Sequence, residues 1–401
     1  MLWGLYLAVS WTWCIGMFLP ILLVRDYGVG GFLAFALPNV VGAAAMGWTL
    51  RSRTISVRLA QRHARAMGAF SAVTIAFHLF FVLWLLSMLR DLRALPGVSL
   101  PNWGVLAVGG AGLAAVFGVR RAARSGDRAV TLAALAVWLV SVGVLVALTG
   151  GSQPTPGVGA LLEETSRTPD LLWMAPVFLF GFALCPYLDL TFHHARLQTS
   201  DGGARAAFTL GFGVFFSSMI VLTLVYSGLF AYAVGGGSGA PALAPWALVA
   251  ILGHILVQLV FTVIVHQDRI RATTNASGSL ATLGLGGLAI ALGLLSDRIP
   301  GVGDLSGGEV VYRCFMAFYG LVFPSYVWIA MIPTRDGHSG LGGARGRRKA
   351  RTLAFATSVV APMFWMGFIA GHEIWLAPGL VIVLLSRLAL GRGSQSGDAS
   401  V

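Results

Sequence analysis

One carboxylate, Asp189, lies inside an apolar run of the sequence, where a charged side chain is costly and therefore points to a function. It follows Pro186 by three residues, and a proline inside a helix removes a backbone hydrogen bond and leaves carbonyl groups free. A carboxylate in this position can hold a cation together with those carbonyls, or it can bind and release a proton. The structural alternative is an ion pair with Arg196 or Arg205. We predict Asp189 as an ion-binding residue.

Two histidines, His78 and His254, also fall near the middle of apolar runs. A neutral imidazole can donate and accept a hydrogen bond, or bind a proton near pH 7. Gln258 follows His254 by one helical turn and is expected on the same face. These groups either form a polar binding site or satisfy one another through hydrogen bonds between helices. A metal site that combines the histidines with Asp189 and Cys185 is conceivable, but the sequence lacks a metal-binding motif and we predict none.

Other candidates for the wall of a binding site lie in runs that a proline or glycine can interrupt: Cys14, Gly16, Asn39, Gly181, Tyr187 and Tyr319. The cysteines show no CxxC spacing and lie in apolar runs, so we interpret all three as buried apolar side chains. Glu309 and Arg313 are four residues apart and are expected to pair. No Walker A, HExxH or GxSxG motif occurs, which argues against an ATP-driven pump and the common hydrolases. We predict neither an enzyme nor a bound cofactor.

The composition of the chain indicates the class of protein in which these polar side chains are placed. Of the 401 residues, 57% are apolar and 10% are charged, and the mean hydropathy is +0.82. Soluble domains contain about 25% charged residues, so a soluble or disordered chain is excluded and an all-α integral membrane protein is predicted. The net charge of +12 comes from short basic clusters between apolar runs. This distribution indicates orientation in a bilayer and not nucleic-acid binding.

Twelve apolar runs are each long enough to cross a hydrocarbon core roughly 30 Å thick. They fall near residues 3–24, 31–50, 68–89, 103–119, 129–149, 171–192, 206–232, 244–266, 279–295, 309–332, 353–371 and 374–390. With the N-terminus inside, the inner loops and tail contain 21 basic residues and the outer loops contain five. Cytoplasmic loops carry an excess of arginine and lysine. The pattern therefore predicts twelve transmembrane helices with both termini cytoplasmic.

The first and sixth runs share a pattern that indicates an internal repeat. Each has a glycine four or five residues before a proline, Gly16 with Pro20 and Gly181 with Pro186. The two runs start five helices apart, and an odd number of helices inverts the second copy in the membrane. By this topology and by its interrupted first and sixth helices, the chain resembles the LeuT-fold secondary transporters, which include the sodium:solute symporters and the amino acid–polyamine–organocation superfamily.

The resemblance implies a first five-helix repeat, an external loop, an inverted second repeat, a basic cytoplasmic loop, two further helices and a disordered tail, at residues 1–149, 150–170, 171–332, 333–352, 353–390 and 391–401. It also implies transport of a small solute by alternating access, coupled to Na⁺ or to a proton. In the resembled fold the eighth helix usually supplies hydroxyl groups to a sodium site. Here that helix offers only Thr262, which argues against ordinary sodium coupling.

Two other functions stay open: a membrane sensor or assembly factor that keeps the fold without transport, and a membrane enzyme acting on lipid-linked substrates. A wet cavity among the first, third, sixth, eighth and tenth helices favours transport, a dry centre favours the sensor, and His and Asp residues in a surface groove favour the enzyme. The expected partners are the lipid bilayer and a small solute, with no nucleic acid. Because all but one of the 27 basic residues are arginine, we expect a GC-rich bacterial genome and the bacterial inner membrane. The sequence identifies neither the substrate nor the oligomeric state.

Overall fold

The structure is a computed structural model that describes residues 1–92, 101–150, 165–234, 244–273, 276–333 and 340–391. This part of the chain is helical and contains no strand. Its elements in chain order are α1 (Leu2–Trp11), α2 (Cys14–Thr49), α3 (Arg53–Arg62), α4 (Ala64–Leu92), α5 (Asn102–Ser125), α6 (Asp127–Thr149), η1 (Thr168–Asp170), α8 (Leu171–Leu184), η2 (Cys185–Leu188), α9 (Leu190–Leu197), α10 (Asp201–Leu210), η3 (Gly211–Phe216), α11 (Ser217–Val234), α12 (Pro245–Thr273), α13 (Ala276–Leu294), η4 (Ser296–Arg298), α14 (Gly307–Ala317), η5 (Phe318–Val322), α15 (Phe323–Tyr326), η6 (Val327–Met331), α16 (Gly343–Phe368), η7 (Glu373–Trp375), α17 (Leu376–Ser386) and α18 (Leu388–Gly391). Most of the predicted external loop and the predicted disordered tail lie outside the described residues.

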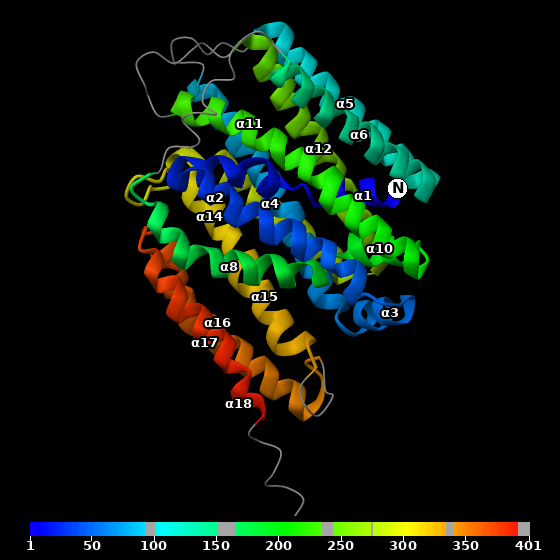
Figure 1. Cartoon of the computed structure of the whole chain (residues 1–401), viewed down its shortest axis with the longest axis vertical. Helices are drawn as coiled ribbons and strands as arrows, with labels where there is room; N and C mark the ends of the chain where they lie inside the picture. The colour runs from blue at the N-terminus through cyan, green and yellow to red at the C-terminus, as the bar shows by residue number, and fades with distance from the viewer. Residues whose placement is uncertain (93–100, 151–164, 235–243, 274–275, 334–339, 392–401) are drawn as a thin grey trace, which may run out of the picture.

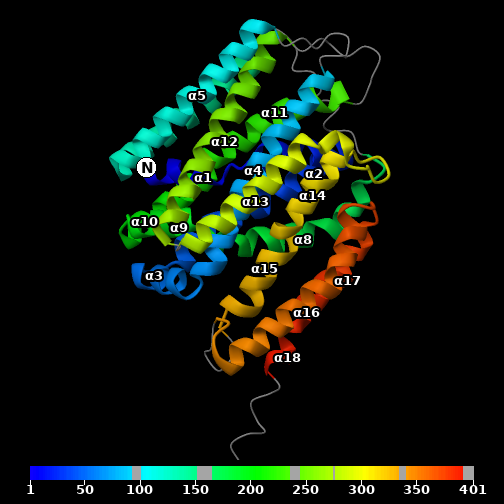
Figure 2. The same ribbon diagram turned by 180° about the vertical axis from the view of Figure 1, so that it is seen from behind.

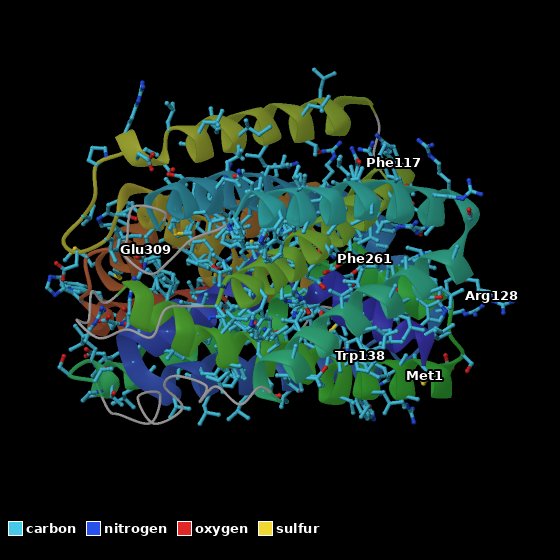
Figure 3. The ribbon with its side chains drawn as sticks, turned by 90° about the horizontal axis from the view of Figure 1, so that it is seen from above. Met1, Phe117, Arg128, Trp138, Phe261 and Glu309 are labelled. Atoms are coloured by element: carbon cyan, nitrogen blue, oxygen red, sulfur yellow. The ribbon has the colours of Figure 1, made fainter. Side chains whose placement is uncertain are left out.

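Nine helices in the described part of the chain are long and apolar enough to cross a membrane: Cys14–Thr49, Ala64–Leu89, Asn102–Ser125, Asp127–Thr149, Thr168–Leu188, Asp201–Ser227, Pro245–Thr273, Gly307–Met331 and Glu373–Leu390. Their outward faces carry large apolar side chains. Leu106 and Phe117 on α5 are 76% and 73% exposed (Figure 3). Lipid, unlike water, accommodates such side chains without cost. The chain is an all-α, multi-pass membrane protein, as its composition predicts.

The N-terminal helices lie in the middle of the bundle. From Gly4 to Trp11 every residue of α1 is buried, and α1 packs against α6, α9, α10, α12 and η3. The α5–α6 pair lies along one side and the α16–α18 segment along the opposite side (Figure 1), while α13 covers α4 (Figure 2). Gly4 and Gly211 allow α1 and η3 to pack closely, since a Cβ atom on Gly4 would lie 3.2 Å from the backbone nitrogen of Gly211. Small residues commonly permit such close helix contacts in membranes.

The first predicted helix is interrupted, but not at the place that the sequence indicates. The break lies at Thr12 and Trp13, between α1 and α2, whereas Gly16 and Pro20 lie inside α2. The Thr12 hydroxyl and the Trp13 indole N–H donate hydrogen bonds of 2.8 and 2.6 Å to carbonyl groups in the last turn of α1. Polar side chains that bond nearby carbonyls compete with helix continuation. They end the helix before the proline is reached.

Two predicted boundaries also differ from the structure. Residues 343–352, predicted as part of a loop, form the first turns of α16, because arginine, lysine and alanine are good helix formers. The left-handed glycines Gly340 and Gly343, with φ angles of 94° and 69°, turn the chain into that helix. The first two predicted helices are joined in α2, with a kink at Gly28, whose φ is 65°.

Loops from distant parts of the chain gather at two ends of the bundle. At one, which we call the basic end, the guanidinium of Arg53 donates to the carbonyl of Thr199 over 3.4 Å, and residues 120–128 lie there too. At the other, the network end, residues 25–27 contact residues 165–170 and Glu309. Figure 3 shows Arg128 and Glu309 at opposite ends of the molecule. Described residues from predicted inner loops thus lie at the basic end, and described residues from predicted outer loops lie at the network end.

Candidate functional site

A second helix break lies opposite the first. The helix that starts with α8 tightens into η2 and then unwinds at Asp189, where ψ is 113°, before α9 begins. The hydroxyls of Ser10 in α1 and Thr191 in α9 form a hydrogen bond of 3.1 Å. The rings of Trp11 and Phe192 pack with their centroids 4.9 Å apart. The two interruptions therefore meet in the centre of the bundle.

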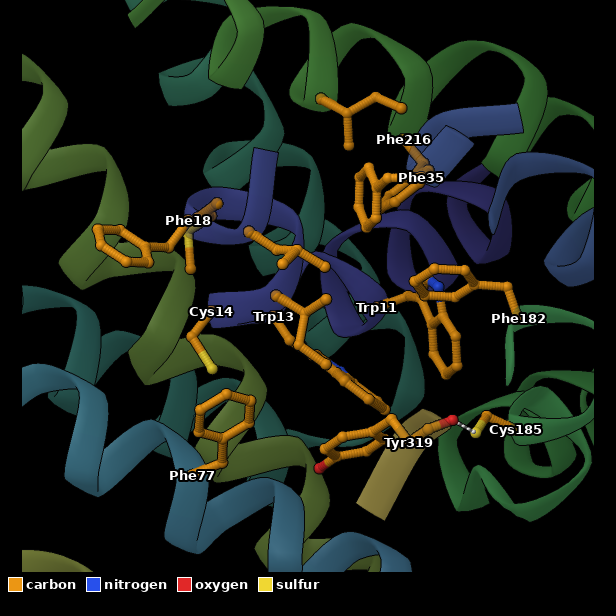
Figure 4. Packing of buried hydrophobic residues seen from close by; sticks show 14 of the residues in the cluster. Trp11, Trp13, Cys14, Phe18, Phe35, Phe77, Phe182, Cys185, Phe216 and Tyr319 are labelled. Atoms are coloured by element: carbon orange, nitrogen blue, oxygen red, sulfur yellow. Dashed lines mark hydrogen bonds between the residues drawn. The ribbon is translucent and has the colours of Figure 1, made fainter. Parts of the chain in front are cut away.

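A small, partly open cavity with a volume of about 30 Å³ lies where the two breaks meet. Its walls come from the end of α1, from α2, from α8 and η2, from α14 and η5, and from the end of α16. They comprise Trp11, Trp13, Ile15, Gly16, Asn39, Val177, Phe178, Gly181, Phe182, Cys185, Met316, Tyr319, Gly320 and Phe368. None of these wall residues is charged, and most are aromatic or aliphatic. Figure 4 shows Trp11, Trp13, Cys185 and Tyr319 converging from three separate segments.

The few polar groups in this wall are held by hydrogen bonds. The Trp11 indole N–H donates to Asn39 Oδ1 over 2.7 Å. The Cys185 thiol donates to the Tyr319 carbonyl over 3.2 Å, as drawn in Figure 4. The Tyr319 hydroxyl bonds the Thr74 hydroxyl at 3.0 Å. The wall is therefore fixed in shape, and it suits an uncharged, largely apolar ligand.

Asp189 is fully buried just beyond this cavity. Its Oδ1 atom accepts hydrogen bonds of 2.7 Å from both the backbone N–H and the hydroxyl of Thr191. Its Oδ2 atom has no hydrogen-bond partner, and it lies 4.0 Å from Nε2 of His266. The alternative partner Arg196 instead forms an ion pair with Asp201, and Arg205 is exposed. The nearest titratable group to Asp189 is thus a histidine that the sequence analysis did not single out.

Gln258, Thr262 and His266 lie one turn apart on one face of α12, and all three are buried. The Gln258 amide donates to the carbonyl of Val9 in the last turn before the first break. Its Oε1 atom, the Thr262 hydroxyl and His266 Nε2 have no hydrogen-bond partner. His266 Nδ1 bonds the Ser71 hydroxyl at 3.1 Å. This face of α12 presents several unpartnered polar atoms, which are rare in protein interiors.

Three other predicted residues, His78, Cys14 and Tyr187, form hydrogen bonds at the two breaks. His78 Nδ1 bonds the carbonyl of Thr74 at 2.7 Å, and its Nε2 atom accepts a 3.4 Å hydrogen bond from the Cys14 N–H at the start of α2. The carbonyl of Cys14 accepts a hydrogen bond of 3.2 Å from the Tyr312 hydroxyl. The carbonyl of Tyr187 in η2 accepts a bond from the His193 ring. These contacts satisfy backbone groups that the helix breaks leave free.

The remaining predicted residues divide between cavity and scaffold. Gly16 and Gly181 line the cavity, and a Cβ atom on Gly181 would lie 2.8 Å from the Tyr319 carbonyl. Pro186 is buried within η2, at the predicted second break. His254 bonds the Ser141 hydroxyl of α6 and lies outside the cavity wall. Cys314 is exposed and not buried as expected, because the outer face of α14 is not covered.

His266 and the wall residues Trp11 and Trp13 are not among the residues predicted from the sequence. His266 falls at the end of the predicted eighth helix, two turns after Gln258. Its helical spacing from Gln258 and Thr262 is the signal that could have identified it. Within the described residues, no three His, Cys, Asp or Glu side chains are placed to hold a metal ion.

A network of ion pairs closes the network end above the cavity. Arg313 lies 2.7 Å from both Asp26 and Glu309, and Arg25 lies 2.7 Å from the same two carboxylates. The predicted pair between Glu309 and Arg313 is confirmed. Arg167 adds ion pairs with Asp26, at 3.8 Å, and with Glu373 of η7. Four segments far apart in the sequence are thereby joined.

A second, smaller cavity lies between this network and the main one. It is lined at its far side by Asp26, Tyr27 and Arg313. Three of its wall residues, Phe178, Met316 and Phe368, also line the main cavity. The two spaces therefore follow one line from the network end towards the helix breaks.

At the basic end, His194 lies between two charged partners. Its Nε2 atom is 2.9 Å from Asp127 Oδ1, and its Nδ1 atom is 2.7 Å from an Arg269 nitrogen. Burial, and after it the charge of Arg269, lower the pKa of His194 below its ordinary value. The ring is therefore neutral at pH 7, so that Nδ1 accepts from Arg269 while Nε2–H donates to Asp127. This contact joins the α5–α6 turn, α9 and α12 below the breaks.

Comparison of the chain with models of protein families, with curated proteins and with solved structures gave no match in any of the three.

Proposed function

We propose that the protein is a secondary active transporter that moves a small, largely apolar solute by alternating access. The observation that carries the proposal is the small, mostly apolar cavity at the meeting point of two broken helices. Discontinuous helices at membrane depth are the usual location of solute sites in transporters. Neutral walls rich in aromatic side chains favour a solute without net charge.

The proposed architecture has twelve transmembrane helices, with five in each of two inverted repeats and two more at the C-terminus. In this scheme, α1 and the part of α2 before Gly28 form the first transmembrane helix, and the rest of α2 forms the second. The helices α13 and α16 are also counted as membrane-spanning. Two observations support it. The breaks occur in the first and sixth helices of this scheme, and the loops group at two ends as the basic-residue pattern requires. Both termini are then cytoplasmic, in the inner membrane of a bacterium.

In this proposal the two ends act as gates. The ion network holds the outer side closed, because residues 25–27, 165–170 and 309–313 cannot separate without breaking charge pairs. The smaller cavity beneath it is the outer part of the solute path. The contacts of His194 hold the inner side closed. Transport requires that each set of contacts opens in turn while the other stays formed.

Coupling to an ion gradient follows from the absence of an ATP-binding motif in the sequence. The candidate ion site is Asp189, with Na⁺ or a proton as the coupling ion. Its unpartnered oxygen and its position next to a break support this role. The membrane-enzyme alternative calls for His and Asp residues at a surface groove. Asp189 and His266 are completely buried, whereas His194 and Asp127 lie beside a small pocket at the basic end and are bonded to each other.

A sensor that binds the same solute without moving it is the second candidate, and the mostly apolar lining of the cavity favours it. One experiment separates the two. The full chain in nanodiscs is screened by thermal unfolding against small uncharged and zwitterionic solutes, and each compound that stabilises it is tested for uptake into proteoliposomes. We expect a stabilising solute to accumulate when a proton or sodium gradient is imposed. Stabilisation without uptake under either gradient identifies a sensor, and no stabilisation by any apolar solute contradicts the proposed site.

A further inference from the structure

Asp189 precedes α9 and His266 lies in α12, yet two of their unpartnered atoms lie close together. Oδ2 of Asp189 and Nε2 of His266 are 4.0 Å apart, and both side chains have no exposed surface. Every other polar atom of the two groups is bonded, to Thr191 and to Ser71. In this pair, Oδ2 and Nε2 are therefore the two atoms without a hydrogen-bond partner, and a proton between them would allow them to bond each other.

The charge of the pair depends on one proton. With one proton bound, the pair is neutral overall, either as carboxylic acid and imidazole or as carboxylate and imidazolium. Without it, an uncompensated carboxylate remains in a dry interior, which is costly. With two protons, an uncompensated imidazolium remains. The buried state consequently favours one shared proton, and the two groups titrate as a unit.

The surroundings do not supply another charge to replace this proton. In the described residues, the titratable groups that interact electrostatically with the pair are His78 from α4, Tyr6 from α1 and Tyr319 from η5. None of them is a permanent cation. His193, the next histidine on α9, bonds Ser56 and the Tyr187 carbonyl instead.

We propose that Asp189 and His266 bind a single proton between them and that this proton is the coupling ion of the transporter, an inference that rests on the proposed function. The pair takes the proton from water on one side of the membrane and returns it to water on the other. No further reactant is needed. A sodium ion fits the gap poorly, because hard cations prefer oxygen ligands, and the group opposite the carboxylate oxygen is an imidazole nitrogen.

The solute cavity is connected to this pair through the first break. The Trp13 ring lines the cavity and packs against His266 with their centroids 5.7 Å apart. The Trp13 N–H bonds the Ser10 carbonyl, and the Ser10 hydroxyl bonds Thr191, which holds Asp189. A solute that moves Trp13 therefore shifts both partners of the proton site. This contact chain gives the coupling a physical route.

The first test measures the proton without any solute. Thermal unfolding of the full chain in nanodiscs is followed between about pH 6 and pH 9, where free imidazole loses its proton. The folded pair holds a proton that the unfolded chain releases, so the pair makes the unfolding temperature fall as the pH rises. Histidines that are buried without charge, such as His194, give the opposite slope in the wild type and in the variants, so the effect of the pair is read as the difference in slope between wild type and variant. Asp189→Asn and His266→Gln should each lose the contribution of the pair to the slope, and Asp304→Asn, at an exposed carboxylate, should keep it. Equal slopes in all four proteins would overturn the inference, and the histidine variant keeps the test decisive if the Asn variant does not fold.

The second test distinguishes the ions. At about pH 8, where an unpaired histidine is neutral, sodium chloride is compared with choline chloride. We expect no difference in the unfolding temperature of the wild type. Saturable stabilisation by Na⁺ that disappears in Asp189→Asn would overturn the inference in favour of a sodium site.

The third test separates this inference from the proposed function. In proteoliposomes loaded with a solute from the screen, Asp189→Asn should lose proton-driven accumulation while it retains solute exchange. Full accumulation by this variant would show that the pair does not couple transport to protons, while the proposal that the protein is a transporter would still hold. Failure of every solute to bind would remove the transporter, whereas the pH slope would still report the shared proton.

Discussion

Replacing Arg313 by methionine should lower the free energy of unfolding by about 3–5 kcal/mol, the usual effect of removing one partner from a buried ion pair. The Arg313 side chain is only 11% exposed, and it contacts Asp26, Glu309 and the carbonyl of Phe368. Methionine preserves much of the volume. The free energy of unfolding therefore falls because Asp26 and Glu309 lose one cationic partner and keep only Arg25 at 2.7 Å. Thermal unfolding in detergent, followed by tryptophan fluorescence, measures the effect.

Two control variants separate this cause from a general effect of charge removal. Arg347→Met removes an exposed arginine from α16 and should change stability little. The double variant Asp26→Asn with Arg313→Met removes one charge of each sign and should recover part of the loss. If Arg313→Met were as stable as the wild type, the description of the network as a closed, buried gate would be contradicted.

Replacing Gly320 by methionine should abolish solute binding without unfolding the protein. A Cβ atom at Gly320 would lie 3.5 Å from Val177 and from Phe368, which is ordinary contact distance with two residues of the cavity wall. The longer side chain then fills the space where the solute is expected. Filling a cavity with an apolar group commonly preserves or raises stability. We expect the stabilisation by solute in thermal unfolding to disappear, a loss of at least about tenfold in affinity, since even one misplaced methylene can cost that much.

The matched control is Gly109→Met on α5. A Cβ atom at Gly109 would meet nothing within 4 Å, and the residue is exposed on the outer face. This variant should bind solute like the wild type. Unchanged binding by Gly320→Met would place the solute site elsewhere.

The sequence allowed the membrane class and the position of Asp189 beside a helix break to be predicted, because the first depends on composition and the second on a proline in a single helix. The partner of Asp189 could not be predicted. His266 belongs to another helix, and only the packing of α9 against α12 brings the two together. The same holds for the ion network, in which the Glu309–Arg313 pair follows from spacing but Asp26 and Arg167 join it across the fold.

The position of the first break shows why local rules were insufficient. Pro20 was the strongest helix-breaking signal in the first run, yet the chain accommodates it within α2. The helix ends earlier because Thr12 and Trp13 offer side-chain donors to the last carbonyls of α1. Such bonds depend on side-chain orientation, which Trp13 acquires by packing against Phe70 and Tyr319. Trp13, which is not among the predicted residues, thus contributes to both the break and the cavity wall.

The central claim, alternating access to the cavity, is tested most directly by labelling Cys185, whose thiol lines the cavity. Cys14→Ala and Cys314→Ala leave Cys185 as the single thiol, and a membrane-impermeant methanethiosulfonate is applied to either face of sealed vesicles. Thr54→Cys at the basic end and Asp304→Cys at the network end, both exposed, mark the inner and outer faces in parallel samples. We predict that Cys185 reacts from both faces, more slowly than either marker, while each marker reacts from its own face alone. Reaction of Cys185 from one face only, or from neither, would contradict transport through this cavity.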